Sequence, residues 1–375
     1  MKNIIAFLSL SIVFCCQQVF ANASPSFIDK TMKSFMQQYQ IPGAAVAIID
    51  HGKSSIYVYG YANMEKKEPI SRQTIFEVGS ITKLLTTLLL SEEVKNQQLQ
   101  LSNSLTQYLP EFRGNLLLKG ITLENLATYS SGLPFNAPEL IKTPKQLQDY
   151  LMHWQPTEGI GSRWQYSNMG IGLLGSVLQN KNHKEINNLY RERILAPLHM
   201  SLIGLEIPQA LQKNQAQGYT DKGKPDVHLP LGLFPSAGAM KANIQDMSHF
   251  LVAAIGLPEA PINIRQAMEF SQTPRLQVGD MQQAMAWQVY PLEDKNKLVA
   301  PENMNLDSLP VKWLSKDKVK FNPNALIDKT GATYGFRAYI AVIPGQESGI
   351  VILTNRYVSN GAIVNTGRHI LFALK

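Results

Sequence analysis

The chain has 375 residues, of which 45% are hydrophobic and 17% charged, and its formal net charge is +7. This composition is typical of a globular protein with a substantial core, and it excludes disordered, collagen-like and fibrous chains. The charge excess is mild, and the most basic stretch, Lys312–Lys320, lacks the interleaved aromatic residues of a nucleic-acid groove. We therefore expect no nucleic-acid partner, whereas a modest positive field is compatible with small anionic substrates.

The first 23 residues have the pattern of a secretory signal peptide. A basic start is followed by the apolar run Ile4–Phe14 and by a small-x-small pattern that ends at Ala23, so we expect cleavage after Ala23. A membrane anchor is less favoured, because an apolar run that spans a bilayer needs roughly 20 residues. A lipoprotein attached through Cys15 or Cys16 is also less favoured, because bulky Phe14 stands where a small residue is wanted before Cys15. The expected mature protein is secreted into the periplasm, is not stably inserted in a membrane and lacks both cysteines.

The two ends of the remaining chain show strand patterns. The elements predicted near the N-terminus are a helix at 24–40 and a hairpin with strands at 44–50 and 54–62. Those predicted near the C-terminus are a β-rich stretch at 325–343, a strand at 349–353 and a closing helix at 362–375. The middle of the chain is mostly helix-like, at 80–99, 144–153, 171–180 and 244–255.

These elements predict an α+β fold, in which an antiparallel sheet from both termini is flanked by helices and joined to a helix-rich second lobe. We expect a single catalytic domain over 24–375, with the sheet lobe at about 24–76 and 300–375 and the helix-rich lobe at about 77–299. An active site is expected in the cleft between the two lobes.

Several kinds of chemistry find no support in the sequence. The seven histidines are scattered, without an H-E-x-x-H motif or a close pair, so no metal site is expected. No serine has glycine at both −2 and +2, which excludes the nucleophile elbow of α/β-hydrolases. There is no glycine-rich phosphate cradle, and we expect no cofactor.

A serine and a lysine at the start of a helical run form the first candidate site. Ser80 and Lys83 are three residues apart, which places both side chains on one helical face. A lysine in a dry cleft beside another cation can have its pKa lowered enough to activate a hydroxyl nucleophile. The pattern is weak by itself, because an N-cap serine beside a solvated lysine explains it equally well and Ser315 with Lys318 repeats it.

Two further motifs strengthen this prediction. Tyr166-Ser167-Asn168 precedes a predicted helix and can direct Tyr166 and Asn168 into the cleft. Lys329-Thr330-Gly331 begins a β-rich stretch, where its glycine permits close approach of a ligand and its lysine and threonine offer a cation and a hydroxyl to a carboxylate. The order S-x-x-K, Y-x-N, K-T-G in a secreted chain favours a serine hydrolase.

With these motifs the sequence resembles the serine β-lactamase and penicillin-binding protein superfamily, and most closely the class C (AmpC-type) β-lactamases. The resemblance covers nearly the whole mature chain. It includes the segments Phe76-Glu77-Val78-Gly79-Ser80, Leu126-Ala127-Thr128-Tyr129, Tyr166 to Gly172, Lys329 to Thr333 and Gly349 to Asn355. The class A pattern fits less well, because the chain has no S-D-N motif and Glu139 precedes Tyr166.

The resemblance implies a role for each matching residue. Ser80 is the acylated nucleophile, Lys83 and Tyr166 share the general-base work, and Lys329 helps to lower the pKa of Tyr166. The backbone N–H groups of Ser80 and Ala332 form the oxyanion hole. The resemblance further implies a set of residues that bind the β-lactam: Lys329, Thr330 with Gly331, and Asn360 for its carboxylate, and Asn168 assisted by Asn136 for its acylamide side chain.

The chain also departs from the family pattern. Gly238 replaces the usual active-site tyrosine, Arg337 stands where a small residue is usual, and Ile363 replaces a common arginine. These departures concern substrate range more than the acylation residues. The leading expectation is a monomeric β-lactamase that hydrolyses small-molecule cephalosporins or penicillins. A DD-peptidase or esterase of the same superfamily, and a penicillin-binding sensor that does not hydrolyse its ligand, are the alternatives.

Overall fold

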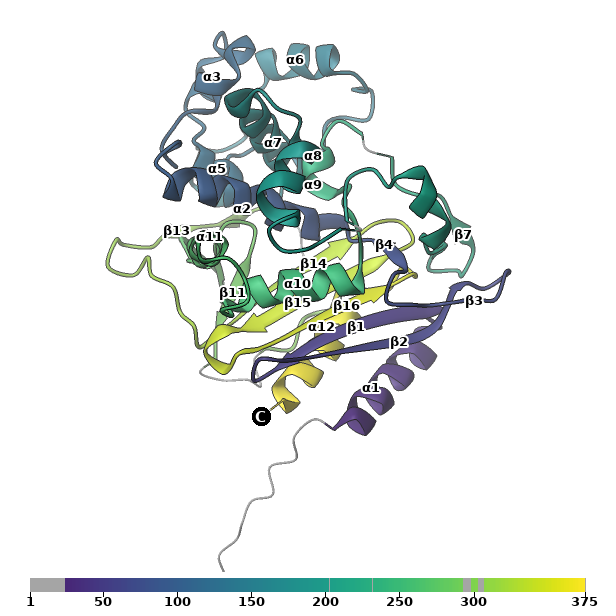
Figure 1. Ribbon diagram of the computed structural model, residues 1–375. Coiled ribbons are helices and arrows are strands. Elements are labelled where there is room, and N and C mark those ends of the chain that lie inside the picture. The colour runs from purple at the N-terminus through teal and green to yellow at the C-terminus, as the bar shows by residue number, and fades with distance from the viewer. Residues whose placement is uncertain (1–23, 202, 231, 293–297, 303–306, 375) are drawn as a thin grey trace, which may run out of the picture.

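The computed structural model describes residues 24–201, 203–230, 232–292, 298–302 and 307–374 (Figure 1). The predicted signal peptide, 1–23, lies outside the described residues. The central element is an antiparallel sheet in the order β13-β9-β10-β11-β14-β15-β16-β1-β2-β3. Its strands are β13 (Lys312–Trp313), β9 (Leu276–Val278), β10 (Met281–Gln283), β11 (Gln288–Pro291), β14 (Ala325–Ala332), β15 (Arg337–Ile343), β16 (Ser348–Thr354), β1 (Gly43–Asp50), β2 (Lys53–Asn63) and β3 (Glu68–Pro69).

The two ends of the chain meet in the middle of this sheet, as the sequence predicts. Strand β1 pairs with β16, with Ala44 opposite Thr354, and also forms the predicted hairpin with β2. The sequences of β1, β15 and β16 are almost continuous apolar runs because these strands are buried on both faces. Alternate residues of β1, such as Val46 and Ala47, belong to two separate hydrophobic cores, one on each face of the sheet.

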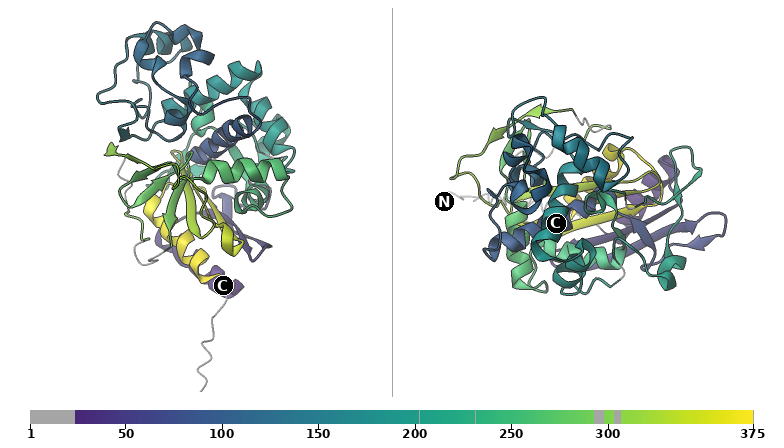
Figure 2. Two further views of the ribbon diagram at one scale, coloured as in Figure 1. Left: turned by 90° about the vertical axis from the view of Figure 1, so that its left-hand side faces the viewer. Right: turned by 90° about the horizontal axis from the view of Figure 1, so that it is seen from above.

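The terminal helices α1 (Pro25–Gln38) and α12 (Asn360–Ala373) cover one face of the sheet, and the helix-rich lobe covers the other (Figures 1 and 2). Ser24 caps α1 and Ser359 caps α12, each through its side-chain oxygen. Helices α10 (Ile244–Ile255) and α11 (Ile262–Gln272) lie on the lobe side, where α10 packs against β1 and β16 and α11 packs against α2 (Thr82–Lys95).

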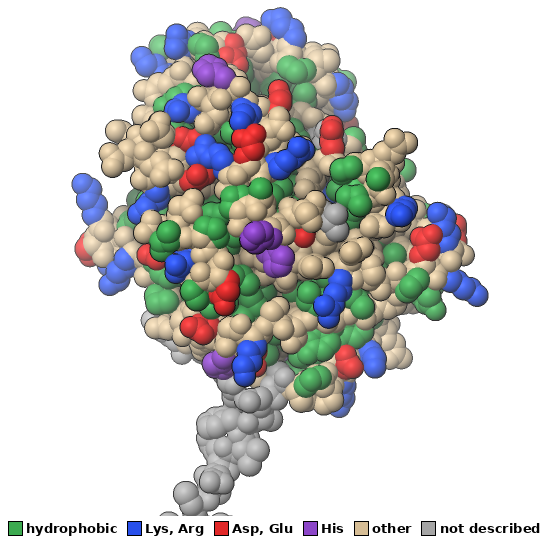
Figure 3. Space-filling model, viewed as in Figure 1, with side chains coloured by type: hydrophobic (Ala, Val, Ile, Leu, Met, Phe, Trp, Pro, Cys, Tyr) green, Lys and Arg blue, Asp and Glu red, His purple; other side chains and the backbone are tan. Residues whose placement is uncertain are grey.

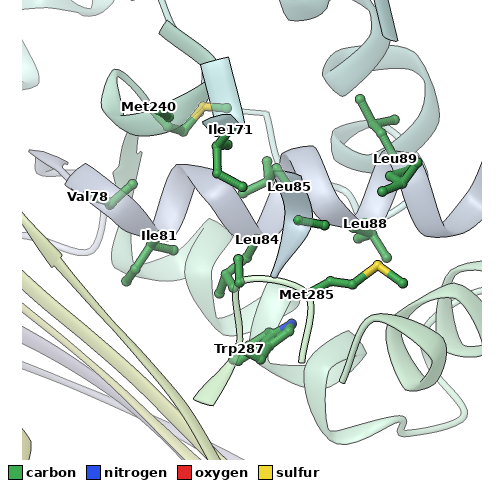
Figure 4. Packing of buried hydrophobic residues seen from close by; sticks show 14 of the residues in the cluster. Val78, Ile81, Leu84, Leu85, Leu88, Leu89, Ile171, Met240, Met285 and Trp287 are labelled. Carbon is green, nitrogen blue, oxygen red and sulfur yellow. The ribbon is translucent and has the colours of Figure 1, made fainter. Parts of the chain in front are cut away.

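Helix α2 lies in the centre of the helix-rich lobe and is buried on nearly all sides. Figure 4 shows Leu84, Leu85 and Leu88 of this helix packed among Ile171, Met240, Met285 and Trp287. The surrounding helices are α3 (Leu105–Tyr108), α4 (Leu116–Lys119), α5 (Leu123–Ala127), α6 (Pro144–His153), α7 (Asn168–Asn182), α8 (Ile186–Tyr190) and α9 (Pro235–Gly238). Because every residue from Thr82 to Ser91 is buried, α2 has no solvent-facing side over this length and is a core helix.

Short elements complete the fold. Three two-stranded sheets are formed by β4 (Ile75–Glu77) with β8 (Lys241–Asn243), β5 (Arg163–Trp164) with β12 (Leu309–Pro310), and β6 (Gly218–Tyr219) with β7 (Pro225–Asp226). Single turns of 3₁₀ helix occur at Gly79–Ile81, Pro110–Phe112 and Pro344–Gln346, a longer one at Gln209–Asn214, and a π-helical turn at Arg191–Leu195.

The predicted elements agree with this structure except at some boundaries. Helices α6 and α10 begin and end at the predicted residues, whereas the helix predicted from residue 80 begins at Thr82, after a 3₁₀ turn. The sheet also extends further than the sequence predicts. Strands β9, β10 and β11, at 276–291, belong to the sheet, whereas the sequence predicts that this stretch is part of the helix-rich lobe. They are only three or four residues long, which is too short for a clear alternating pattern.

The surface bears charges of both signs. On the face in Figure 3, basic and acidic side chains are interspersed rather than gathered in one block. Within the described parts of the chain, no helix has the length and apolar character needed to cross a bilayer.

Candidate active site

Ser80 lies on the 3₁₀ turn that leads into α2, at the junction of the sheet and the helix-rich lobe. Two contacts with Met240 fix this turn: the N–H of Val78 donates to the Met240 carbonyl, and the N–H of Met240 donates to Thr82 Oγ1. The hydroxyl of Thr82 in turn donates to the carbonyl oxygen of Gly79 at 2.6 Å. The positive φ of Gly79, 51°, turns the chain sharply just before Ser80, so the serine is held at a fixed position.

Lys83 is completely buried and its ammonium group has three acceptors. Its Nζ donates to Ser80 Oγ at 3.0 Å, to Asn168 Oδ1 at 2.6 Å and to the carbonyl oxygen of Ala237 at 2.6 Å. Burial, and to a lesser degree the positive charge of Lys329, lower the pKa of Lys83 to about 8, although Tyr166 opposes this shift. Lys83 can therefore accept or release a proton near neutral pH.

Tyr166 lies between two lysines. The ammonium groups of Lys83 and Lys329 are 5.0 and 5.1 Å from the centre of its ring, and its hydroxyl lies close to Ser80 and Lys329. Burial by itself raises the pKa of Tyr166, but the charges of Lys329 and Lys83 outweigh burial and lower this pKa to about 7. On the other side the ring packs against Tyr129, with a centroid distance of 4.6 Å. Tyr166 is thus a rigidly held phenol that ionises near neutral pH.

Asn168 and Asn136 are joined by a hydrogen bond. Asn168 is the first residue of α7, where Ser167 caps the helix, and its Nδ2 donates to Asn136 Oδ1 at 2.8 Å. Its backbone N–H donates to the carbonyl oxygen of Phe135, which ties the start of α7 to the loop containing Asn136. Since Asn168 Oδ1 also accepts a hydrogen bond from Lys83 Nζ, the two predicted acylamide-binding residues are directly connected to the predicted base.

The strand that contains Lys329-Thr330-Gly331 passes beside the serine. Among the described residues, the ladder between β14 and β11 ends at Asp328, and further along the strand Gly331 and Ala332 lie against the serine turn at Val78 and Gly79. The N–H of Thr333 donates to the Phe336 carbonyl across the β14–β15 hairpin. Because successive N–H groups of a strand point to opposite edges, the N–H and carbonyl groups of Ala332 point away from β15, towards the serine turn. An amide hydrogen in this position, close to Ser80, is suited to an oxyanion hole.

Thr330 and Asn360 lie on a shared cavity of about 320 Å³, between β14 and the start of α12. Tyr290 and Val364 supply apolar parts of its lining. Lys329 is buried beside it, and its Nζ donates to the Thr330 carbonyl at 2.8 Å. The structure therefore brings all ten predicted site residues to one region. Six of them form a connected group: Ser80, Lys83, Tyr166, Asn168, Asn136 and Lys329. Gly331 and Ala332 lie on the strand beside this group, and Thr330 and Asn360 line the cavity.

Three residues of this region have functions that the sequence analysis did not predict. Ala237 contributes only its carbonyl oxygen to Lys83, and such a contribution leaves no signal in a sequence. Tyr129 forms the packing surface for Tyr166. Glu77 is 4% exposed and accepts hydrogen bonds from His228 Nδ1 and from the N–H of Leu229, so it anchors the 228–229 loop beside the serine turn. The sequence signal was available for Glu77, since it is a carboxylate within an apolar strand.

The three departures from the family pattern have different surroundings. A Cβ atom on Gly238 would have no neighbour within 4 Å, so this position leaves open space beside Ala237. Arg337 is buried, and its guanidinium donates to the carbonyls of Thr333 and Phe336. Ile363 is fully buried in the core between α12 and the sheet. Among the residues described, no group of three or more His, Cys, Asp or Glu could hold a metal ion.

Comparisons with known proteins agree with this geometry. The beta-lactamase family model matches residues 28–375. A beta-lactamase of Escherichia coli (strain K12) is 33% identical over 356 residues, which cover 93% of this chain and 93% of the relative. The crystal structure of a class C beta-lactamase in complex with cefoxitin superposes with a TM-score of 0.87 at 31% identity, over 92% of this chain and 98% of that one.

A further solved structure is similar to the same extent. It is a beta-lactamase/D-alanine carboxypeptidase from Pseudomonas syringae, with a TM-score of 0.88 and 30% identity, over 93% of this chain and 99% of that one. Together these similarities confirm the class C resemblance that the motifs indicate and the α+β fold predicted from the strand and helix patterns.

Proposed function

This chain belongs to the beta-lactamase family of serine hydrolases, and from this premise we propose that it is a class C-type β-lactamase. In this proposal it hydrolyses the β-lactam amide of cephalosporins and penicillins through an acyl-enzyme on Ser80. The observation that carries it is the position of Tyr166, a phenol between two ammonium groups and close to the nucleophile, with a pKa of about 7.

Acylation begins with proton transfer from Ser80. The Tyr166 phenolate accepts the proton of Ser80 Oγ, with Lys83 sharing it, and the oxygen attacks the β-lactam carbonyl carbon. The N–H groups of Ser80 and Ala332 stabilise the resulting oxyanion, which collapses as the C–N bond breaks. Tyr166 then delivers the proton to the departing nitrogen, which leaves Ser80 as an ester of the opened lactam.

Deacylation uses the same groups in reverse order. The Tyr166 phenolate accepts a proton from a water molecule, which attacks the ester carbonyl, and Ser80 recovers its proton as the acid product leaves. During both steps Thr330, Asn360 and Lys329 hold the carboxylate of the substrate, while Asn168 and Asn136 contact its acylamide group. A small anionic substrate is consistent with the cationic site.

A D-alanine carboxypeptidase is the second candidate, because the similar Pseudomonas syringae protein is described as both a beta-lactamase and a D-alanine carboxypeptidase. Its acylation step requires the same residues. Assays of the purified protein with a chromogenic cephalosporin, with a peptide ending in D-Ala-D-Ala and with a simple ester would distinguish these functions. Rapid catalytic colour supports the lactamase, whereas a single stoichiometric burst indicates a penicillin-binding sensor.

Cleavage of the peptide or ester without cephalosporin turnover would refute the lactamase proposal. Ser80→Ala abolishes turnover of every substrate in this scheme, and activity that survives the change would refute the assignment of the nucleophile. Ser91→Ala is a matched control, because Ser91 is a buried serine further along the same helix α2.

We also propose that the protein is exported to the periplasm as a monomer, with removal of residues 1–23. The apolar run and the small-x-small pattern at Ala23 support this. Mass spectrometry of the protein recovered from the periplasmic fraction is expected to give Ser24 as the N-terminal residue. Recovery of the intact chain from the cytoplasm would contradict export.

A further inference from the structure

We propose that Tyr334 is a specificity-determining residue, whose exposed ring stacks on a flat aromatic group at the end of the acyl side chain of the substrate. This inference rests on the proposed function, which it extends to a substrate class. Tyr334 lies two residues after Ala332, at the tip of the β14–β15 hairpin. Tyr334 is 65% exposed, so its ring is available to a bound molecule.

Tyr334 and Ala332 are both exposed, whereas Gly331, Thr333 and Gly335 are buried. Ala332 is the last residue of β14, and Tyr334 lies in the two-residue loop that follows, which the hydrogen bond from the N–H of Thr333 to the Phe336 carbonyl closes. The exposed tyrosine is thus separated from the proposed oxyanion donor Ala332 by a single buried residue.

The hairpin tip is held rigidly by its neighbours. Arg337, itself 4% exposed, donates from one guanidinium nitrogen to the carbonyls of Thr333 and Phe336, which lie on either side of Tyr334. The N–H of Tyr219 donates to the Gly335 carbonyl, and Phe336 is buried against Phe76. Because the backbone of the turn is already fixed, stacking has to order only the two side-chain torsions of Tyr334, which limits the conformational entropy lost on binding.

A substrate bound beside β14 has its acyl side chain directed towards the hairpin tip that contains Tyr334. Lys329 and Thr330 bind the carboxylate, which is attached on the leaving-group side of the scissile bond. A carbonyl bound at the N–H of Ala332 therefore has its acyl side further along β14, in the direction of 333–334. On the lobe opposite β14, Gly238 contributes no side chain and leaves open space for a bulky group.

Binding of boronic acids tests this inference without requiring turnover. The boron accepts Ser80 Oγ, so that a B–O bond forms, the serine proton passes to Tyr166, and a tetrahedral anion results. We compare phenylacetamidomethylboronic acid with acetamidomethylboronic acid by calorimetry. The original protein is expected to bind the phenyl compound about 2- to 10-fold more tightly. Tyr334→Ala abolishes this ratio, whereas Tyr334→Phe, which keeps the ring, retains it.

Two further variants complete the test. Tyr61→Ala removes an exposed tyrosine of β2 and should leave the ratio unchanged. Phe135, which is also exposed but packs on Tyr166, is the competing aromatic residue. The inference would be overturned if Phe135→Ala abolishes the preference for the phenyl compound and Tyr334→Ala keeps it. It would also be overturned if the unmodified protein binds both compounds with equal affinity. Binding with the expected ratio but without β-lactam hydrolysis would refute only the lactamase function, and failure of both compounds to bind would overturn both.

Discussion

The carbonyl oxygen of Val78 lies directly against Gly331, so that a Cβ atom on Gly331 would overlap it. The same holds one residue further along each segment, where a Cβ atom on Gly79 would overlap the backbone of Ala332. The serine turn and the K-T-G strand are therefore in backbone contact, with no side chain between them. This contact sets the distance between the two proposed oxyanion donors, which come from segments about 250 residues apart.

Gly331→Ala is expected to lower kcat/KM about 100-fold, because the added methyl group pushes the strand edge away from Ser80 and a displacement of about 1 Å has an effect of this size. Steady-state kinetics with a chromogenic cephalosporin measure the loss. Gly159→Ala adds the same methyl group where its nearest neighbour would be 3.6 Å away, and it should leave kcat/KM unchanged. A fully active Gly331→Ala protein would contradict the steric argument.

The pH dependence of kcat/KM should report the ionisation of Tyr166. Activity is expected to rise with pH through about 7, as the phenol loses its proton. Removing the positive charge in Lys329→Ala destabilises the phenolate, so the pKa of Tyr166 rises and the acidic limb of the profile moves to higher pH. Lys312→Ala, at an exposed lysine of β13, is the control and should not move it. An acidic limb that stays in place in Lys329→Ala would contradict the assignment.

Tyr166→Phe should lower kcat about 100- to 10,000-fold, because it removes the proposed general base and keeps the ring. The ring still packs on Tyr129, so the unfolding temperature is expected to change little. The acidic limb near pH 7 should disappear from whatever activity remains. If Tyr166→Phe retains both the original kcat and the acidic limb of the pH profile, another group is the base, and Lys83 would be the candidate.

Glu77 should stabilise the protein in a pH-dependent manner. Burial by itself raises the pKa of this carboxyl, but the hydrogen bonds from His228 and Leu229 outweigh it and hold the pKa below the usual 4.5. Its contribution is therefore present above about pH 4.5 and is lost as the pH falls further. Urea unfolding at pH 7 should show Glu77→Gln to be less stable by about 1–2 kcal/mol.

The difference between the original protein and Glu77→Gln is expected to shrink on acidification towards pH 3. Glu65→Gln, at an exposed carboxylate, should match the original protein at each pH. A destabilisation by Glu77→Gln that stays constant from pH 7 to pH 3 would show that the charge of Glu77 is not responsible.

Hydrophobic patterning and motif order predicted much of this protein. The apolar runs of β1 and β16 indicate strands buried on both faces, because burial of a strand leaves no polar alternation. The boundaries of α6 follow from Thr143, which caps the helix, and from Pro144 at its first position. The pairing of Ser80 with Lys83 is likewise local, since a single turn of chain brings i and i+3 together. Short-range geometry is enough for all of these features.

Only the tertiary structure decided how the site works. The pKa of Tyr166 depends on two lysines from distant segments and on complete burial, and a sequence does not reveal either distance or burial. The acceptor that Ala237 provides to Lys83 is a backbone carbonyl, which every residue type possesses. Gly331 and Ala332 can lie against the serine turn because the ladder of β14 with β11 stops at Asp328, and strand pairing is set by the packing of the whole sheet. Sequence therefore predicted the candidate reactive groups, and long-range packing determined their protonation and orientation.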